Sequence, residues 1–176
     1  MLNQHPYFMD YYRQCQLKDY NSFRTEAVAK ILCKPRSVEE LRQCLSDYRD
    51  EKKLILGGGC NIFFTKDFDG LVIKPEIKGL REMSDEEDED VFIEVMASEN
   101  WDEFVAYSVE EGFSGLENLS YIPGTVGASP IQNIGAYGAE VKDTIREVVA
   151  IDMQTSEVIS FSNAECEFAY RDSIFK

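Results

Sequence analysis

Histidine and paired cysteine are what this 176-residue sequence most clearly lacks, since His5 is its single histidine. The five cysteines are odd in number and contain no C-x-x-C pair; they are Cys15, Cys33, Cys44, Cys60 and Cys166. Without histidine partners for these thiols, we expect neither a zinc site nor a Cys–His nucleophile, and therefore no metal. Unpaired thiols are typical of a reducing compartment, so we predict a cytoplasmic protein.

Long apolar runs and positive charge are also scarce. No apolar run approaches the roughly 20 residues that span a bilayer, and the first ten residues do not resemble a signal peptide. Lysine and arginine number 18 against 33 aspartates and glutamates, which gives a formal net charge of −15. A field of this sign repels nucleic acid and anionic membranes, so we expect neither as a partner.

The acidic residues are concentrated in one run, because seven of the nine residues from Glu82 to Asp90 are acidic. Two interpretations are open for this run. It is either a docking surface for a basic partner or a solvated, self-repelling loop between strands. We favour the loop, and the sequence identifies no protein partner.

The hydrophobic fraction of 44% indicates a folded chain, and its pattern predicts alternating strands and helices. Ser37 and Glu40 have capping-box spacing and precede an apolar stripe, Val38, Leu41, Leu45 and Tyr48, which predicts a helix. A second helix is expected at about 100–111 and a short one near 163–168. Strands are expected at 27–32, 54–56, 71–73 and 91–97, followed by a hairpin of 146–153 with 157–161.

This order of elements predicts an α+β fold of two units, with the seam near Pro75. Between the second helix and the hairpin, residues 112–138 form a long stretch that is rich in glycine. Long loops in compact proteins are usually functional or disordered, and the apolar content of this one indicates order.

Two glycine-containing segments are candidates for chemistry. In L-I-L-G-G-G-C-N, three glycines directly follow the strand expected at 54–56. Residues without a Cβ allow backbone N–H groups to converge on a phosphate. However, Ile62 stands where a dinucleotide fingerprint needs glycine, and the Gly-Lys-Ser/Thr of a P-loop is missing. By itself the segment favours a simple tight turn.

The second candidate is I-P-G-T-V-G-A-S-P-I-Q-N-I-G-A-Y-G, residues 122–138. Its small residues allow close backbone approach to a flat ligand, and Ser129, Gln132 and Asn133 supply hydrogen-bonding groups. A loop that is ordered by its own packing and binds no ligand explains the composition equally well.

Together with N-S-F-R-T-E-A near the start and A-Y-R-D-S-I-F-K at the end, these segments resemble the UDP-N-acetylenolpyruvoylglucosamine reductase family over nearly the whole chain. The S-P-I-Q-N-I-G wording is similar to the type I branch of these bacterial flavoenzymes of peptidoglycan synthesis. The resemblance implies the FAD-binding PCMH-type (FAD-linked oxidase-like) fold, with FAD between two α+β subdomains. We expect these at 1–75 and 76–176, with the second incomplete and the substrate-binding C-terminal domain absent.

The resemblance also implies a reaction and the residues that serve it. NADPH reduces the flavin, which passes hydride to the enolpyruvyl double bond of a nucleotide sugar. Tyr170 and Arg171 match the substrate-contacting pair, and Arg171 matches the catalytic arginine, a cation beside developing enolate charge. The residues that match FAD-binding positions are Gly57, Gly58, Gly59, Cys60, Asn61, Ile122, Pro123, Gly124, Ser129, Gln132, Asn133, Gly135, Ala136 and Tyr137.

Two departures from the family pattern are visible. Cys60 stands where the family usually has serine, and nothing nearby in sequence would activate it as a nucleophile. The family's proton-donating serine and its glutamate lie beyond the Y-R-D-S-x-F-K segment, and here the sequence stops at Lys176. We therefore expect a truncated chain that binds FAD weakly and does not turn over alone.

Three alternatives remain at this point. The chain could be another flavoprotein of the FAD-linked oxidase fold with a different substrate, or a non-enzymatic module that binds a basic partner through its acidic run. Considered without the family, Arg171 could also simply form a surface salt bridge with Asp172 or a neighbouring acid.

Overall fold

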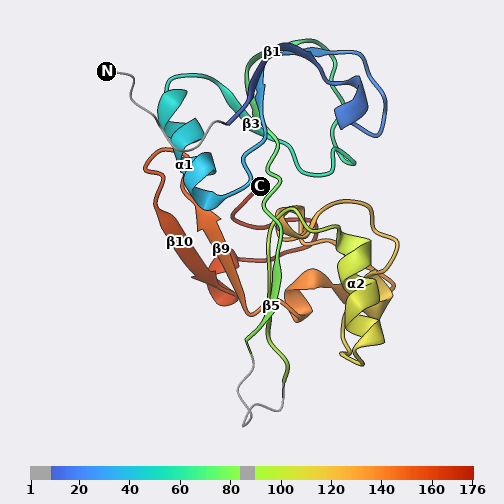
Figure 1. The fold of residues 1–176 in the computed structure, drawn as a ribbon. Coiled ribbons are helices and arrows are strands. Elements are labelled where there is room, and N and C mark those ends of the chain that lie inside the picture. The colour runs from blue at the N-terminus through green and yellow to red at the C-terminus, as the bar shows by residue number, and fades with distance from the viewer. Residues whose placement is uncertain (1–8, 84–89) are drawn as a thin grey trace. The chain divides into compact units, whose positions relative to one another are not determined.

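The computed structural model describes residues 9–83 and 90–176. Contacts divide the chain into two compact units, Met1–Ile77 and Lys78–Lys176, which are described one at a time (Figure 1). Most of the acidic run from Glu82 to Asp90 lies outside the described residues. Within the two described ranges, no helix is long and apolar enough to cross a membrane, and no cluster of histidine, cysteine and carboxylate side chains is suited to a metal ion.

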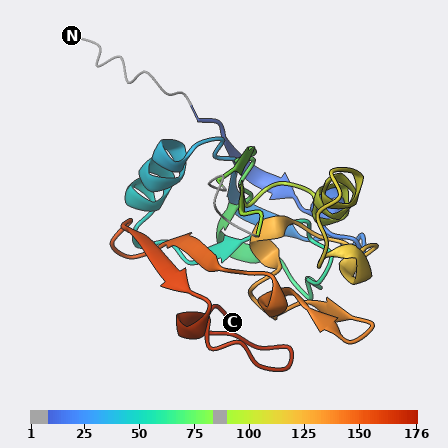
Figure 2. The same ribbon diagram turned by 90° about the horizontal axis from the view of Figure 1, so that it is seen from below.

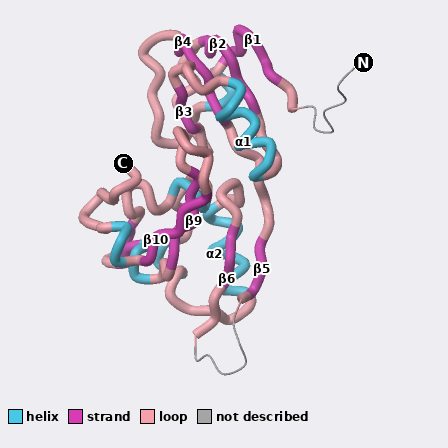
Figure 3. The backbone as a smooth tube through the Cα atoms, turned by 90° about the vertical axis from the view of Figure 1, so that its left-hand side faces the viewer, coloured by secondary structure: helices cyan, strands magenta, loops and turns pink. Residues whose placement is uncertain are grey.

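Unit 1 is built on a four-stranded sheet in the order β1-β2-β4-β3 (Figure 3). The strands β2, β4 and β3 run parallel, and β1 is antiparallel to β2. Their bounds are Tyr11–Gln16 for β1, Val28–Cys33 for β2, Lys53–Ile55 for β3 and Phe68–Ile73 for β4. The three parallel strands confirm the apolar segments expected at 27–32, 54–56 and 71–73, whereas β1 was not predicted.

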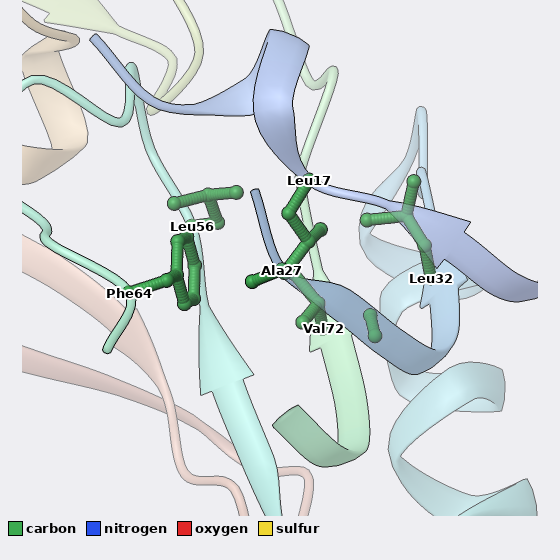
Figure 4. Packing of buried hydrophobic residues seen from close by; sticks show 7 residues of the cluster. Leu17, Ala27, Leu32, Leu56, Phe64 and Val72 are labelled. Carbon is green, nitrogen blue, oxygen red and sulfur yellow. The ribbon is translucent and has the colours of Figure 1, made fainter. Parts of the chain in front are cut away.

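The core of unit 1 lies against this sheet (Figure 4). The parallel register places Leu32 of β2 opposite Val72 of β4, so that the two branched side chains meet in the interior. Segments between the strands complete the cluster, whose buried members are Leu17, Ala27, Ala29, Leu32, Leu56, Phe64 and Val72. Leu56 directly precedes Gly57, so the core anchors the start of the glycine segment.

The helix α1, Val38–Asp47, begins as predicted at Ser37, whose side chain accepts a hydrogen bond from the backbone N–H of Glu40 at 3.1 Å. The reciprocal bond of a capping box is absent from this helix start. The Glu40 carboxylate instead accepts from the backbone N–H of Arg36 at 2.6 Å, one residue earlier. The buried face of the helix contains Leu45, as expected, and also Cys44.

Unit 2 combines a second helix with three two-stranded pairs and several single helical turns. The helix α2, Trp101–Glu110, is capped by Asn100, whose side chain accepts from the backbone N–H of Glu103. The antiparallel pairs are β5 (Leu80–Glu82) with β6 (Ile93–Val95), β7 (Gly135–Ala136) with β8 (Ala139–Glu140), and β9 (Glu147–Ile151) with β10 (Val158–Ser162). Figure 2 shows β9 and β10 as the predicted hairpin.

The single helical turns are 3-10 helices: η1 (Lys18–Tyr20) in unit 1, and η2 (Glu117–Leu119), η3 (Val126–Ala128), η4 (Val141–Asp143) and η5 (Ala164–Cys166) in unit 2. The last replaces the helix expected near 163–168. The core of unit 2 gathers around Trp101, whose indole N–H donates to the Leu119 carbonyl at 2.8 Å. Its other buried members are Val105, Leu119, Ile134 and Val141.

The cap of α1 gives a first test of this fold. Replacement Ser37→Ala removes the acceptor for the Glu40 N–H and should lower the free energy of unfolding by about 1 kcal/mol. Ser46→Ala is the matched control, because Ser46 is exposed near the end of the same helix and its loss should change stability by less than about 0.5 kcal/mol. Urea titrations followed by circular dichroism measure both, and equal effects would refute the cap.

Candidate functional site

The first candidate segment, Gly57–Asn61, lies at the carboxyl ends of the parallel strands of unit 1. Ile73 of β4 pairs with Cys33 of β2 and with Ile55 of β3, so the three strands end at the same edge. Ligands of open parallel sheets bind beyond this edge. The topology therefore places the three glycines where a bound group is expected.

Three consecutive carbonyls of this segment are held by other groups of unit 1. The Gly57 carbonyl accepts from Lys74 Nζ at 3.1 Å, that of Gly58 from Cys60 Sγ at 3.5 Å, and that of Gly59 from the Ser22 N–H at 3.0 Å. The described chain contains no cis peptide bond. In a trans peptide the C=O and the following N–H point in opposite directions.

The orientation of the N–H groups follows from those three bonds. The amides of the residues that follow each carbonyl, Gly58, Gly59 and Cys60, point away from the groups that hold the carbonyls. Successive N–H groups that converge form an anion-binding concavity, and these three amides are the candidates for one in unit 1. No acidic residue occurs between Gly57 and Lys66, so no carboxylate within the segment opposes a phosphate.

Gly59 is the residue at which this arrangement most needs glycine. Its φ is +69°, and a Cβ placed there would lie 2.0 Å from the backbone oxygen of Tyr20. Any side chain would therefore drive the segment away from the turn that carries Tyr20 and Ser22. Close packing of backbone against backbone thus fixes the third glycine.

Asn21 holds that turn in place, and the sequence did not identify it as a site residue. The side chain is buried, and its Nδ2 donates to the carbonyls of Leu17 at 2.8 Å and Thr25 at 3.1 Å. Its Oδ1 accepts from the Thr25 N–H at 3.0 Å. Because Tyr20 and Ser22 are its chain neighbours, Asn21 sets the surface on which the glycine segment rests. A signal was present, since Asn21 opens the N-S-F-R-T-E-A segment.

The second candidate segment, residues 122–138, is joined within unit 2 to the chain around Tyr170. Asn133 makes the connection: its side chain is fully buried, and Nδ2 donates to the carbonyl of Ala169 at 3.0 Å. Its Oδ1 accepts from the N–H of Lys142 at 3.1 Å. The amide of Asn133 is thus engaged with the backbone, so its contribution to a site is to position the residues around it.

Two further hydrogen bonds join the same parts of the chain. The guanidinium of Arg171 donates to the Gly135 carbonyl at 3.3 Å, and the Ser173 hydroxyl donates to the Ile131 carbonyl at 2.8 Å. Residues about 40 positions apart are therefore held as one structure. The structure brings together the glycine-rich segment and the predicted substrate-contacting pair.

Two residues at this connection, Tyr137 and Arg171, have a strained backbone. Tyr137 and Arg171 have φ values of +52° and +53°, in the left-handed region that residues with a Cβ rarely adopt. Such strain collects at functional sites, where the surrounding structure enforces it. The side chain of Tyr137 is 91% exposed and that of Tyr170 is 85% exposed, so each is available to a ligand.

The salt bridge considered for Arg171 is not the arrangement observed. Asp172 instead pairs with Lys176, at 3.8 Å between carboxylate and ammonium. The ammonium of Lys176 also donates to the Arg171 carbonyl at 2.8 Å, which helps to fix the Arg171 backbone.

The other predicted positions of this segment are a mixture of buried and exposed residues. The Gly124 carbonyl accepts from the Trp101 N–H at 3.2 Å, which ties the segment to the start of α2. Gly127, which was not predicted, approaches so closely that a Cβ would lie 2.5 Å from the Ala97 Cβ. Ser129 is buried, Ile122 and Ala136 pack on the core, Gln132 is partly buried and Pro123 is exposed.

Comparison with known proteins identifies the family. The model of the FAD binding domain matches residues 29–162. The chain belongs to this FAD-binding domain family. Within unit 1, the match covers the glycine segment that follows β3, and within unit 2 it covers the segment 122–138.

The relatives found carry the name of the family that the sequence resembles, and so they confirm that resemblance. The UDP-N-acetylenolpyruvoylglucosamine reductase of Flavobacterium johnsoniae is 51% identical over 160 residues, 91% of this chain and 47% of that protein. The reductase of Neisseria gonorrhoeae is 49% identical over 162 residues, 91% of this chain and 46% of that protein. The chain thus spans about half the length of the curated relatives it matches.

Solved structures confirm the fold class. UDP-N-acetylenolpyruvylglucosamine reductase (MurB) from Thermus caldophilus superposes with a TM-score of 0.76 at 25% identity, over 94% of this chain and 57% of that one. A solvent-stable cholesterol oxidase superposes with a TM-score of 0.61 at 13% identity, over 91% of this chain and 34% of that one, and shows the shared fold alone. The α+β, FAD-linked oxidase type of fold is therefore confirmed.

The packing of Gly59 on Tyr20 leads to a prediction about FAD. Replacement Gly59→Ala should weaken FAD binding at least about tenfold, because the segment must move to accommodate the methyl group. Gly112→Ala is the control: its φ is also positive, +80°, but its Cβ would meet nothing within 4 Å, and it lies outside both candidate segments. It should cost only the backbone strain, about 1–2 kcal/mol.

Titration of FAD, followed by quenching of flavin fluorescence, compares the two glycine variants with the unmodified chain. Equal affinity in Gly59→Ala and the unmodified chain would contradict the amide arrangement described for residues 57–61.

The buried amide of Asn133 leads to a second prediction. Replacement Asn133→Ala leaves the Ala169 carbonyl and the Lys142 N–H without their partner, at a cost of about 1–3 kcal/mol for each group. Hydrogen exchange over residues 169–176 should therefore become faster, by about tenfold or more. Asn118→Ala, at an exposed position, should leave this exchange unchanged. Protection that is unaltered in the Asn133 variant would show that Asn133 does not hold this segment.

Proposed function

We propose that this chain is the FAD-holding part of an NADPH-dependent UDP-N-acetylenolpyruvoylglucosamine reductase, which forms UDP-N-acetylmuramate for peptidoglycan in the cytoplasm. The observation that carries the proposal is the fixed connection between segment 122–138 and Tyr170–Arg171, in a chain 51% identical to a reductase of that name. A role in cell wall formation, and through it in cell shape and division, follows from this reaction.

The residues of the first segment fit the phosphate part of FAD. A protein with a formal charge of −15 cannot attract an anionic cofactor through its overall field, so attraction must be local. The amides of Gly58, Gly59 and Cys60 supply it, because partial positive charges on N–H groups act at hydrogen-bond distance without a compensating carboxylate. We propose that the remaining predicted FAD-binding residues, in segment 122–138, contact the rest of the cofactor.

Bound FAD supplies the hydride that reduces the substrate's double bond, with NADPH as its source. The contribution of this chain to the chemistry is the cation of Arg171. A guanidinium has five N–H donors in a fixed plane, and the bond to the Gly135 carbonyl orients that plane. Held in this way, it stabilises the negative charge that develops on the substrate as hydride arrives. The exposed ring of Tyr170 beside it orients the nucleotide sugar.

The reaction is tested in a protein that carries this segment at the full length of its relatives. FAD should remain bound during purification and give a yellow protein. With NADPH present, UDP-N-acetylglucosamine enolpyruvate should be consumed together with NADPH. A panel of other hydride acceptors separates this reaction from that of a flavoprotein with the same fold and a different substrate. Consumption of NADPH with another acceptor alone would refute the proposal.

Arg171 provides the sharpest test of the mechanism. Arg171→Met in the full-length protein should lower kcat by about 10²–10³, because the cation beside the developing charge is lost. Flavin should still be bound, since Arg171 is not itself among the proposed FAD contacts, and the flavin content reports whether loss of its bond to the Gly135 carbonyl disturbs them. Arg81→Met is the control: Arg81 is an exposed cation of the same unit, paired with Glu94, and its loss should leave kcat unaltered. A kcat preserved in the Arg171 variant would remove this residue from the mechanism.

A further inference from the structure

A lysine outside the predicted site residues lies against the glycine segment of unit 1. Lys74 is the first residue after β4, and its backbone N–H donates to the Cys33 carbonyl at 2.9 Å, which continues the parallel ladder. From that position its side chain reaches back over 17 residues to the Gly57 carbonyl, at 3.1 Å from Nζ. The ammonium is thus fixed at the same sheet edge as the glycines.

We propose that Lys74 is a positioning residue for the anionic phosphates of FAD: its ammonium holds the Gly57 carbonyl and so turns the Gly58 N–H toward the phosphate. The proposal rests on the FAD-binding role proposed above. In this proposal, Lys74 acts on the phosphate through the Gly57–Gly58 peptide and does not contact the phosphate directly.

The chemistry of the peptide group supports this action. A hydrogen bond from a cation to a carbonyl is roughly twice as strong as one between neutral groups. It also polarises the whole peptide, so the N–H on the opposite side becomes a stronger donor. One ammonium therefore fixes the direction of the Gly58 N–H and increases its attraction for an anion.

The neighbouring carboxylate does not compete for Lys74. Glu76 pairs with Lys34 at 3.7 Å and with Arg36 at 3.4 Å. Lys34 in turn lies over the ring of Tyr20, 5.0 Å from its centroid, and the Tyr20 carbonyl abuts Gly59. One lysine thus supports each end of the glycine segment, Lys74 at Gly57 and Lys34 through Tyr20 at Gly59.

The charge state of Lys74 gives the proposal a distinctive pH dependence. Burial lowers the pKa of Lys74; Lys34 acts in the same direction, and Glu76 and Cys60 act against it. A phosphate anion nearby favours the charged ammonium, so FAD binding should raise this pKa and take up protons. FAD affinity should therefore fall as pH rises through the pKa of Lys74 in the free protein. Cys60, the thiol of the same glycine segment, is removed from the comparison by using Cys60→Ser as the background.

The experiment is a set of FAD titrations in the Cys60→Ser background, from about pH 7 to about pH 10, just below the ordinary pKa of lysine, with flavin fluorescence as the readout. At the lower pH, Lys74→Met should weaken FAD binding about tenfold or more. Lys74→Arg should recover most of the affinity, because the guanidinium stays charged. Lys66→Met removes an exposed lysine of the same unit and should leave the affinity unchanged.

The pH profile separates positioning from a merely structural role. Affinity should fall with pH in the background protein and stay flat in Lys74→Arg, whose cation does not titrate in this range. A Lys74→Met variant with normal affinity, or a Lys74→Arg variant with the same fall as the background, overturns the inference. Circular dichroism identifies any variant that has lost its fold, and the Lys74→Arg profile then decides alone. Failure of the background protein itself to bind FAD refutes the proposed function instead.

Discussion

The orientation of a few peptide groups is the constraint on which the proposed site depends. The chain carries a formal charge of −15, so its overall field opposes an anionic cofactor. Attraction must come from groups that act over hydrogen-bond distances, and main-chain N–H groups do so only if their carbonyls are turned away. In unit 1 the carbonyls of Gly57, Gly58 and Gly59 all have partners within the protein. The glycines permit this conformation, and the partners select it.

Buried asparagines perform equivalent work in the two units. Asn21 in unit 1 and Asn133 in unit 2 are both buried, and each uses its side-chain amide to hold backbone groups. An asparagine has donors and an acceptor on one rigid plane, so it can fix two strands of irregular chain at once. Most of the chain around each asparagine lies outside regular ladders, and buried polar groups need partners. These residues therefore allow irregular chain to remain ordered at the positions proposed to bind FAD.

The parts of this structure that the sequence predicted are those set by local pattern. Ser37 begins α1 because its hydroxyl lies close to the following N–H groups, and apolar runs identified the parallel strands of unit 1. The strand β1, Y-Y-R-Q-C-Q, escaped because it is an edge strand with mostly exposed side chains and thus has no apolar pattern. The capping-box spacing predicted the start of α1 correctly, and the Glu40 carboxylate accepts from the backbone N–H of Arg36.

The site residues that the sequence predicted are likewise those set by local pattern. Family resemblance identified the glycine segments, Tyr170 and Arg171, because each belongs to a contiguous sequence motif. Lys74 and Asn21 were missed, since their roles arise from contacts made in three dimensions. Lys74 acquires its role only when β3 and β4 pair and bring Gly57 within reach of its ammonium. A lysine after an apolar strand is otherwise an ordinary surface residue.

Backbone strain at Tyr137 and Arg171 means that their conformation depends on the surrounding hydrogen bonds. Tyr137 and Arg171 occupy the left-handed region, which costs of order 1–3 kcal/mol for each residue. The bonds from Asn133 to Ala169, from Arg171 to Gly135 and from Ser173 to Ile131 supply stabilisation of similar size. The side chains can therefore be held outward in one orientation only while these bonds are intact. A guanidinium on relaxed backbone would instead be free to turn toward a carboxylate such as that of Asp172, its chain neighbour, and away from a substrate.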